Sequence, residues 1–512
     1  MNKKKILIYS LLFLCGVIYN AVGCNHFDGL LDEGYAINCV ARILDGHIPY
    51  KDYFSLITPA SSYVGAVVYG LSGRNIMALR IFTACLAAMF PVVVFWGIEN
   101  FGKSRVMAVT GYAATLFFGL SIYRMSFITY HYGANLFGVL SVFLLCVYFF
   151  GRKQKKVYPV LSGVCLSMSV LYKQTIGLYY ALGFIICVTI MILADKRQKE
   201  VMNYIKWFAG SIGVMAFAYI AYFVANSAFG DMYRNLVEIP LNSFVGVRIS
   251  PPSIKQAVKV FRDMNFETVV ALEFWIEVIM LGMNAVIIVW KIAKKQLKVA
   301  SVNVVLMVFA VCAFLHNFER FSFYQAVSTL PMIVIAVCVN SGAWKKTGRI
   351  DNILSAGVGI LAAVLCFYSA ELRIDRMNTV MANETVYFPE TKLYTTEEQA
   401  DRYTELFAAM DEFGISGGES YIYPMSPLIY ELKDVENTTR QDLTIMGNFD
   451  QEGIGEIIDC LENTRYIIFD NYWDMDGIEF KTYASEIYDY VESNYEVVWM
   501  LDERMQILER RN

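Results

Sequence analysis

The sequence has few charged residues and few histidines. Asp, Glu, Lys and Arg make up 18% of its 512 residues, and only four residues are histidine. None of the eleven cysteines belongs to a CxxC pair, which argues against a zinc or redox site of that type. The chain has no strong internal repeat, and its basic residues lie in short separate segments. That distribution excludes the single basic patch expected for nucleic acid, so we expect no nucleic-acid partner.

Hydrophobic residues dominate instead. They form 56% of the chain, and the mean hydropathy is +0.44, which is too apolar for an ordinary soluble fold. These residues are gathered in runs long enough to cross about 30 Å of hydrocarbon, which takes roughly 20 residues each. The sequence therefore predicts a polytopic α-helical membrane protein.

The net charge of −4 hides two oppositely charged parts. Residues 371–512 hold 31 acids and 11 bases, a net charge of −20, whereas residues 1–370 hold 16 acids and 32 bases, a net charge of +16. We therefore expect a membrane domain over residues 1–370 and a solvated acidic domain over residues 371–512.

Basic clusters at alternate junctions between the hydrophobic runs predict the orientation. We expect about eleven spans, near 6–23, 76–97, 106–122, 132–150, 157–172, 176–194, 204–225, 271–290, 300–315, 321–340 and 350–369. The basic clusters lie at 3–5, 103–105, 152–156, 196–199, 291–298 and 345–349. By the positive-inside rule the N-terminus is cytoplasmic and the C-terminal domain extracytoplasmic, in a cell membrane that we expect to be bacterial. The first run resembles a signal peptide but lacks a small-x-small cleavage site, so we expect it to remain as a span.

The junctions on the other side are longer and carry different residues. In the first outer loop, residues 24–75, segments 34–44 and 60–71 have apolar residues at helical spacing and are expected to be interfacial helices. Cys24 and Cys39 fall on one side of the membrane, where a disulfide between them is one option. A second long outer loop covers residues 226–270 and contains the helix-breaking Pro251-Pro252.

The sequence of the acidic domain predicts alternating strands and helices. We expect helices near 396–413, 452–463 and 483–494 and strands near 420–423, 466–470, 496–500 and 505–508. Thr395 or Thr396 is expected to cap the first helix, with Glu398 as capping partner. This order predicts a small α/β domain, and it contains no glycine-rich phosphate loop.

Polar side chains gather at the outer ends of the expected spans. All four histidines are placed there, as are the charged residues found at span ends: His26, His47, His131, His316, Arg80, Arg124, Lys173, Glu319 and Arg320. Ionisable groups near hydrocarbon usually face a cavity or one another. The alternative for any single residue is an interfacial anchor or an ion pair that sets the depth of a span.

The sharpest local feature is Asp32-Glu33-Gly34-Tyr35, directly after the first span. Two adjacent acids at the membrane surface can supply a general base with a charge partner, or ligands for a divalent cation. The simpler interpretation is a helix N-terminus, where acids are favoured by about 0.3–1 kcal/mol.

A longer pattern surrounds this pair. It comprises Asp32-Glu-Gly-Tyr35, Ala41-Arg-Ile-Leu-Asp-Gly46, Pro49-Tyr-Lys-Asp52-Tyr-Phe54, Pro59 and residues 73–80. It resembles the first outer loop of GT-C glycosyltransferases, which use polyprenyl-phosphate sugars and include protein O-mannosyltransferases and the bacterial aminoarabinose and Rgt-type transferases. The resemblance extends to Leu171-Tyr-Lys-Gln-Thr175, to residues 126–135 and to the outward C-terminal domain, although the specific motif covers only about 60 residues.

The resemblance implies an inverting transfer, in which an acceptor hydroxyl attacks the anomeric carbon of a sugar on lipid phosphate. Asp32 would be the general base, and Glu33 would orient it or help to hold a divalent cation, the one cofactor considered. Lys173, Arg80 and Arg124 would stabilise the departing phosphate, and Gln174 would hydrogen-bond a sugar or phosphate oxygen. The partners would be a polyprenyl-phosphate-linked sugar, an acceptor glycan, lipid or protein, and membrane lipid.

The chain departs from the family pattern in two places, and two other functions compete with glycosyl transfer. Some relatives have Lys-Pro-Pro-Leu where this chain has Leu56-Ile-Thr-Pro-Ala60, and some have a second acid where this chain has Tyr130-His131-Tyr132 and Asn135. His131 could replace that acid, because neutral imidazole accepts protons near pH 7.

A secondary transporter or lipid flippase would need broken spans or charges near the middle of the membrane, and the sequence instead places its charges at one face. A non-catalytic membrane scaffold would not need the acidic pair.

Overall fold

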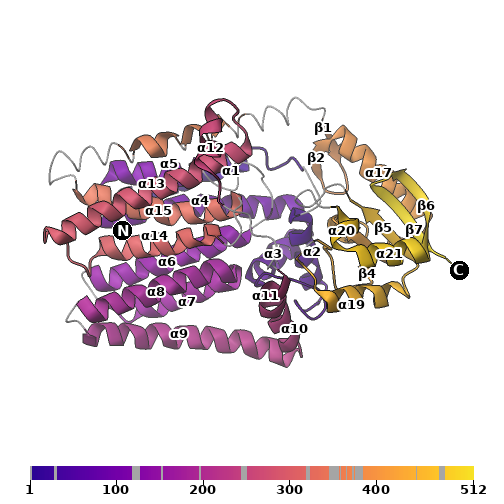
Figure 1. Cartoon of the computed structure of the whole chain (residues 1–512), viewed down its shortest axis with the longest axis horizontal. Helices are drawn as coiled ribbons and strands as arrows, with labels where there is room; N and C mark the ends of the chain where they lie inside the picture. The colour runs from indigo at the N-terminus through magenta and orange to yellow at the C-terminus, as the bar shows by residue number, and fades with distance from the viewer. Residues whose placement is uncertain are drawn as a thin grey trace.

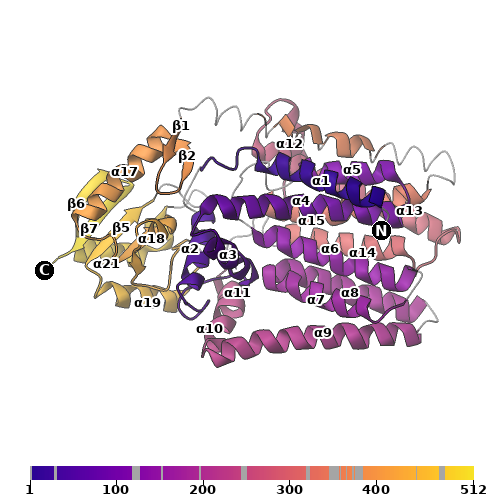
Figure 2. The same cartoon turned by 180° about the vertical axis from the view of Figure 1, so that it is seen from behind.

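The chain is a helical bundle with a small sheet domain at one end (Figure 1). The computed structural model describes residues 3–27, 32–117, 127, 129–151, 154–194, 198–243, 251–318, 323–344, parts of 357–374, 385–445, 447–471 and 479–511. Short helices α2, α3, α10 and α11 lie between the bundle and the sheet domain, and the N-terminus lies toward the opposite end of the bundle (Figures 1 and 2).

Long apolar helices running side by side form the bundle. They are α1 (Lys3–Ala21), α4 (Ile76–Phe101), α5 (Arg105–Phe117), α6 (Thr129–Phe150), α7 (Val157–Tyr172), α8 (Gln174–Ala194), α9 (Gln198–Ala225), α13 (Phe266–Ala293), α14 (Val302–Phe314) and α15 (Phe323–Trp344). Six helices of the described chain are long and apolar enough to cross a membrane, and shorter apolar helices accompany them. The protein is therefore an integral membrane protein, and the number of eleven spans stays a prediction.

Glycines on α6 let aromatic rings approach its backbone. A Cβ added at Gly133 would lie 2.1 Å from the ring of Tyr172 on α7, and one added at Gly138 would lie 2.4 Å from the ring of Tyr180 on α8. Small residues permit such close helix packing in membranes. The packing brings the N-terminal end of α6 against the turn between α7 and α8.

Two helices are present where the sequence predicts them, α2 (Asp32–Leu44) and α3 (Ala60–Leu71), and their place at the outer membrane surface stays a prediction. The disulfide considered between Cys24 and Cys39 is wrong, because both cysteines are free and buried. Further short helices follow in the second loop and after α14: α10 (Phe229–Tyr233), η2 (Arg234–Glu238), α11 (Ile239–Ser243), α12 (Ile254–Val258), η4 (Lys259–Phe261) and η5 (Leu315–Phe318).

The C-terminal domain has a five-stranded sheet in the order β4-β3-β5-β7-β6. Its strands are β3 (Glu419–Pro424), β4 (Glu436–Asn437), β5 (Tyr466–Asp470), β6 (Tyr495–Asp502) and β7 (Met505–Arg510). Strand β3 is parallel to β4 and β5, while β7 is antiparallel to β5 and β6. A hairpin of β1 (Thr385–Phe388) and β2 (Leu393–Thr396) precedes it.

Alternating side chains on the strands pack against helices on both faces of the sheet. Ile422 and Ile468 face α17 (Glu397–Glu412) and α18 (Leu428–Leu432). Tyr421 and Ile467 face α19 (Gln451–Leu461), α20 (Phe480–Tyr483) and α21 (Ser485–Asn494). This period of two is that of a strand covered on both sides, and it confirms the predicted α/β class.

The first helix of this domain is capped as expected by a threonine, but with a different partner. The Thr396 hydroxyl accepts a hydrogen bond from the backbone N–H of Gln399 at 3.3 Å, and the Thr395 hydroxyl donates to the side chain of Gln399 at 2.7 Å. The expectation that Glu398 is the capping partner is therefore wrong. Gln399 occupies the third helical position, from which a side chain can reach back to the cap.

Candidate active site at the outer end of the bundle

The second acid of the predicted pair forms a buried ion pair. Glu33 Oε1 accepts a hydrogen bond from Arg80 Nε at 2.8 Å, and Glu33 Oε2 accepts one from Arg80 Nη2 at 2.5 Å. Glu33 is 4% exposed and Arg80 is 1% exposed. A bidentate guanidinium–carboxylate pair compensates both charges where water does not reach them.

The same pair also holds three chain segments together. Arg80 Nη1 donates to the backbone oxygens of Cys24 and His26 at 2.8 and 2.6 Å, and the backbone N–H of Phe127 donates to Glu33 Oε1 at 2.8 Å. The segment after α1, the start of α2 and the segment before α6 are therefore fixed to α4 by one pair of side chains.

Asp32 differs from its neighbour in burial. It is the first residue of α2 and is partly exposed, whereas Glu33 is buried. The helix dipole favours both acids at this end. In addition, Glu33 satisfies the charge of Arg80. The pair thus separates into a buried acid bound within the protein and a more accessible acid beside it.

Lys173 and His131 meet where the start of α6 lies against the turn between α7 and α8. Lys173 Nζ lies 3.2 Å from His131 Nε2, and His131 Nδ1 lies 2.9 Å from the Ser328 hydroxyl on α15. An ammonium group can only donate, so His131 Nε2 is the acceptor in this contact and Nδ1 carries the hydrogen. The Lys173 ammonium also lies 5.4 Å from the centre of the Tyr130 ring, within cation–π range.

Lys173 is the single residue between α7 and α8. Its backbone is extended (φ −155°, ψ 111°), which ends α7 and allows the chain to turn. The next residue, Gln174, donates from Nε2 to the backbone oxygen of Leu56 at 2.6 Å and accepts from the backbone N–H of Thr58 at 3.3 Å. Gln174 therefore holds the loop segment before α3 against the α7–α8 turn.

The structure thus brings the predicted residues together in two linked groups. Glu33 and Arg80 form one group, and His131 and Lys173 form the other. Phe127 connects them, because its N–H binds Glu33 and it lies four residues before His131. Arg124, Glu319 and Arg320 lie outside the described residues.

The acidic pair does not have the geometry of a shared cation site. The guanidinium of Arg80 and the Phe127 N–H supply three hydrogen bonds to the Glu33 carboxylate, and the positive charge of Arg80 already compensates it, so a metal ion would have to displace this cation. Among the described residues, no three His, Cys, Asp or Glu side chains converge as metal ligands. A cation held by Asp32 and Glu33 remains a prediction that this arrangement does not favour, and we derive no step through one.

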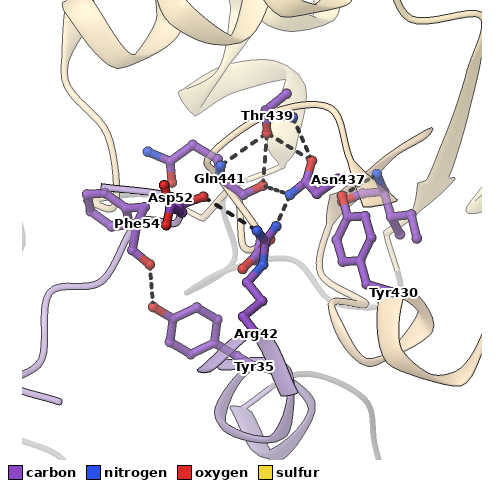
Figure 3. A network of polar contacts seen from close by, with 10 residues as sticks. Tyr35, Arg42, Asp52, Phe54, Tyr430, Asn437, Thr439 and Gln441 are labelled. Carbon is purple, nitrogen blue, oxygen red and sulfur yellow. Dashed lines mark hydrogen bonds and ion pairs between the residues drawn. The ribbon is translucent and has the colours of Figure 1, made fainter. Parts of the chain in front are cut away.

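The outer loop is joined to the C-terminal domain by a buried ion pair. Arg42 Nη2 of α2 lies 2.5 Å from Asp442 Oδ1, which also accepts from Asn437 Nδ2 at 2.7 Å. Figure 3 shows Arg42 extending from α2 toward this part of the C-terminal domain. Burial lowers the pKa of Arg42, but the charge of Asp442 and the hydrogen bond to it outweigh burial and raise the pKa overall.

Further polar contacts join the loops to the C-terminal domain. The Arg440 backbone oxygen accepts from the N–H of Phe54 at 2.8 Å, and its guanidinium pairs with Asp231 at 3.1 Å. Arg234, at the start of η2, lies 2.9 Å from Asp450 and 3.0 Å from Glu456. Arg42 and Arg234 of the loops thus bind acids of the C-terminal domain, whereas Arg440 of that domain binds an acid of the second loop, so the junction uses part of the charge asymmetry.

An apolar contact and a carboxylate complete the junction. A Cβ added at Gly34 would lie 2.9 Å from Leu428 Cβ, so α2 and α18 are in close contact there. Glu431 on α18 accepts hydrogen bonds from Tyr69 and Arg74, each at 3.0 Å. Burial raises the pKa of Glu431, and the charge of Arg74 opposes this shift only in part.

Two buried acids on α13 were missed by the sequence reasoning. Glu273 and Glu277 are both fully buried, and both fall inside the span expected at 271–290. The signal was present, since an ionisable residue within a span is by default a candidate functional residue. The expectation that charges lie only at one face of the membrane is therefore corrected.

Comparisons with known proteins agree with the fold. The family described as dolichyl-phosphate-mannose-protein mannosyltransferase matches residues 57–233, which include α3 to α9 and the residues His131, Lys173 and Gln174. No curated protein sequence matches the chain at a significant level.

Solved membrane enzymes share the architecture at low sequence identity. ArnT from Cupriavidus metallidurans, solved bound to undecaprenyl phosphate, has a TM-score of 0.51 and 10% identity, covering 99% of this chain and 98% of ArnT. The oligosaccharyltransferase AglB from Archaeoglobus fulgidus, solved with an inhibitory peptide and a dolichol-phosphate, has a TM-score of 0.57 and 10% identity, covering 96% and 73%. The mycobacterial arabinofuranosyltransferase AftD has a TM-score of 0.51 and 10% identity, covering all of this chain and 40% of AftD.

The family match covers the middle of the membrane domain, and the fold likeness covers the chain from end to end. The chain therefore shares the fold of these membrane enzymes, and its middle part is similar in sequence to the dolichyl-phosphate-mannose-protein mannosyltransferase family.

Proposed function

We propose that the protein transfers a sugar from a polyprenyl-phosphate donor to an acceptor hydroxyl at the end of the bundle that faces the C-terminal domain. The observation that carries this proposal is the link through Glu33, whose carboxylate joins the start of α2 to the segment before α6. Asp32 precedes Glu33, and His131 follows Phe127 by four residues. An accessible acid and a lysine–histidine pair are thereby tied to one rigid support.

Lys173 is the proposed contact for the donor phosphate. An ammonium group has three N–H donors, so it can donate to His131 and to a phosphate oxygen at the same time. Because Lys173 is fixed in the α7–α8 turn, its charge is preorganised for the negative charge that grows on the departing phosphate. Arg124, which the sequence also predicts for this role, stays a candidate.

Asp32 is the proposed general base of an inverting reaction. The acceptor hydroxyl gives its proton to an Asp32 carboxylate oxygen while its own oxygen forms a bond to the anomeric carbon. The bond from that carbon to the phosphate oxygen breaks, and the electron pair leaves with the polyprenyl phosphate. Glu33 and Arg80 position α2 for this step and do not contact the substrates.

Gln174 is proposed to shape the site through the loop that it holds. Its amide binds the backbone of Leu56 and Thr58, in the segment where some relatives have a lysine. A role in positioning this loop is better supported than the direct sugar contact predicted from the sequence. The Gln174→Glu variant would separate the two roles, because it removes the donor to Leu56 but keeps an acceptor for a sugar hydroxyl.

The proposal includes an orientation. We place the N-terminus in the cytoplasm and the C-terminal domain outside, on the basis of the basic inner junctions and of the two chain ends lying at opposite ends of the molecule (Figure 2). A reporter fused after Asn512 should be extracytoplasmic. A cytoplasmic reporter would contradict transfer on the outer face.

The deciding experiment compares Asp32→Asn with Asp45→Asn in membranes supplied with labelled polyprenyl-phosphate sugars and a mixture of candidate acceptors. Asp45 follows the other end of α2 and pairs at the surface with Arg74, so its variant is a matched control. We expect Asp32→Asn to lower transfer by about 10²–10⁴-fold, the usual contribution of a general base, and Asp45→Asn to leave it nearly unchanged.

Binding of the donor distinguishes a lost base from a lost site. Asp32→Asn should still bind the polyprenyl-phosphate sugar, whereas Lys173→Met should bind it at least about tenfold more weakly. A well-folded Asp32→Asn protein that transfers sugar at the wild-type rate would disprove the assignment of the base. A wild-type chain that binds donor without transferring it would favour the scaffold alternative.

A further inference from the structure

The two buried acids on α13 carry an inference that does not depend on the proposed function. Glu273 and Glu277 are four residues apart, so their side chains lie on one face of the helix. At 1.5 Å per residue they lie roughly 10 and 16 Å along α13 from Phe266, well inside the bundle. Both are 0% exposed, so solvent does not compensate a charge on either one.

Glu277 is bound by neutral donors. The Thr329 hydroxyl of α15 lies 2.9 Å from both of its carboxylate oxygens, and Asn317 Nδ2 of η5 donates to Oε2 at 3.1 Å. Within the described part of the chain, the carboxylate of Glu277 has no Lys or Arg as an ion-pair partner. Its hydrogen bonds draw α13, η5 and α15 together around one carboxylate.

Three neighbouring oxygens are buried and unpartnered. Among the residues that the structure describes, both carboxylate oxygens of Glu273 and the Oδ1 atom of Asn317 have no hydrogen-bond partner. Buried polar atoms in proteins are nearly always satisfied, and a buried unpaired carboxylate is among the costliest groups to leave so. The side-chain amide of Asn317 donates to Glu277 through Nδ2. We therefore assign the unpartnered Asn317 Oδ1 to the same cluster as the unpartnered carboxylate of Glu273.

We propose that Glu273, Glu277 and Asn317 form a binding site for one divalent cation inside the bundle. Two carboxylates supply the matching charge, and all the ligands are oxygen atoms, the donors that Mg²⁺, Mn²⁺ and Ca²⁺ prefer. A proton shared by the two carboxyl groups would leave the Asn317 oxygen unsatisfied, whereas a metal ion satisfies all three side chains. Water completes the coordination sphere, as is usual for Mg²⁺ held by one or two carboxylates.

The site lies next to the lysine–histidine pair. Thr329, which binds Glu277, follows Ser328, which binds His131. An ion at Glu273 and Glu277 would therefore stabilise the position of α15 against α13 and, through Ser328, the orientation of His131. This role is structural and separate from the acidic pair at the start of α2.

Mn²⁺ binding to the purified full-length protein tests the proposal directly. After treatment with EDTA and removal of the chelator, free Mn²⁺ is titrated by electron paramagnetic resonance, and thermal unfolding is measured with and without Mg²⁺, Mn²⁺ or Ca²⁺. We expect one bound Mn²⁺ per chain and a higher unfolding temperature with the preferred ion. Glu273→Gln and Glu277→Gln should each weaken Mn²⁺ binding at least tenfold, while Asp32→Asn should bind Mn²⁺ like the wild type.

A variant with the opposite effect covers the case in which the glutamine variants do not fold. Asn317→Asp adds a third carboxylate where the orphan oxygen lies, so it should bind Mn²⁺ more tightly and depend more strongly on the ion for stability. Wild-type protein that binds no Mn²⁺ would overturn the proposal in favour of a proton alone. So would Glu273→Gln protein that binds Mn²⁺ like the wild type, or loss of the ion in Asp32→Asn but not in Glu273→Gln.

Discussion

Two buried acids, Glu33 and Glu273, occupy opposite situations in the same molecule. Glu33 has a guanidinium and a backbone N–H within 2.8 Å, and all these groups come from the protein itself. Glu273 is just as buried, but no side chain of the described chain bonds to its carboxylate oxygens. The described chain supplies every partner of the first acid, whereas among the same described residues the second acid has none.

The difference indicates what each region is built for. The outer loop must hold Asp32 in place whether or not substrate is present, and a self-sufficient ion pair does this. The α13 cluster leaves the Glu273 carboxyl without a hydrogen-bond partner in the described chain, which makes it a point of instability and, on the proposal above, part of a cation site. Substitutions at the Glu33–Arg80 pair should therefore lower the stability of the protein, whereas removal of the Glu273 carboxylate should raise it when no metal is present.

The largest effect is expected for Arg80→Met. Glu33 would be left buried and unpaired, and breaking a buried pair in this way costs about 3–5 kcal/mol. The thermal unfolding temperature in detergent should fall sharply, and the yield of folded protein with it. Arg465→Met is the matched control, because its side chain is 73% exposed and its pair with Glu509 lies at the surface, so its loss should change stability little.

A double variant identifies the cause of that loss. Adding Glu33→Gln to Arg80→Met removes the uncompensated charge, so part of the lost stability should return. If the double variant were no more stable than Arg80→Met alone, lost packing rather than the buried charge would explain the effect, and the contrast between Glu33 and Glu273 would weaken.

In the next prediction, replacing Glu273 and replacing Glu33 change the unfolding temperature in opposite directions. In EDTA, Glu273→Gln should raise the unfolding temperature, because it removes an unsatisfied buried carboxylate that costs about 1–3 kcal/mol. Glu33→Gln should lower it, because it leaves Arg80 without its counter-charge. Thermal unfolding of the two variants side by side measures the contrast, and a loss of stability in both would show that Glu273 has a partner after all.

The fold was largely readable from the sequence because it rests on local patterns. Hydrophobic runs, basic junctions and strand periodicity predicted the bundle, the two helices of the outer loop and most elements of the C-terminal domain. The short strand β4 was missed, because two residues hold no detectable alternation. The hairpin of β1 and β2 was also missed, and the length of its strands, four residues each, does not account for this.

The site was less readable because its contacts join distant parts of the chain. Arg80 and Glu33 were both singled out, but the sequence cannot show that they pair with each other across 47 positions. Arg42 and Asp442 are 400 positions apart. Glu273 and Glu277 are different, since their place inside a hydrophobic run was visible and should have been weighed.

A smaller effect is expected where the outer loop meets the C-terminal domain. Asp442→Asn would leave the Arg42 guanidinium, which is 12% exposed, without its acid, at a cost of about 1–2 kcal/mol. Hydrogen exchange should then increase in α2 and around β4, where the two parts are joined. Glu509→Gln, which affects an exposed pair with Arg465, should leave both regions unchanged.

The smallest effect is a pH dependence at Glu431, which lies between the two extremes because it is partly buried and partly compensated by Arg74. Burial raises its pKa in the folded protein above the unfolded value of about 4.3. The folded state therefore binds the proton more tightly. Its contribution to stability is fully present below the unfolded pKa and is lost as the pH rises through the raised pKa of the folded state.

Hydrogen exchange of α3 and α18, measured for wild type and Glu431→Gln at each pH, should show wild-type protection falling relative to the variant as pH increases. Glu436→Gln, at an exposed position of β4, should follow the wild type. Protection that instead rose with pH would mean that Arg74 outweighs burial, and Glu431 would then belong with Glu33 among the acids completed by folding.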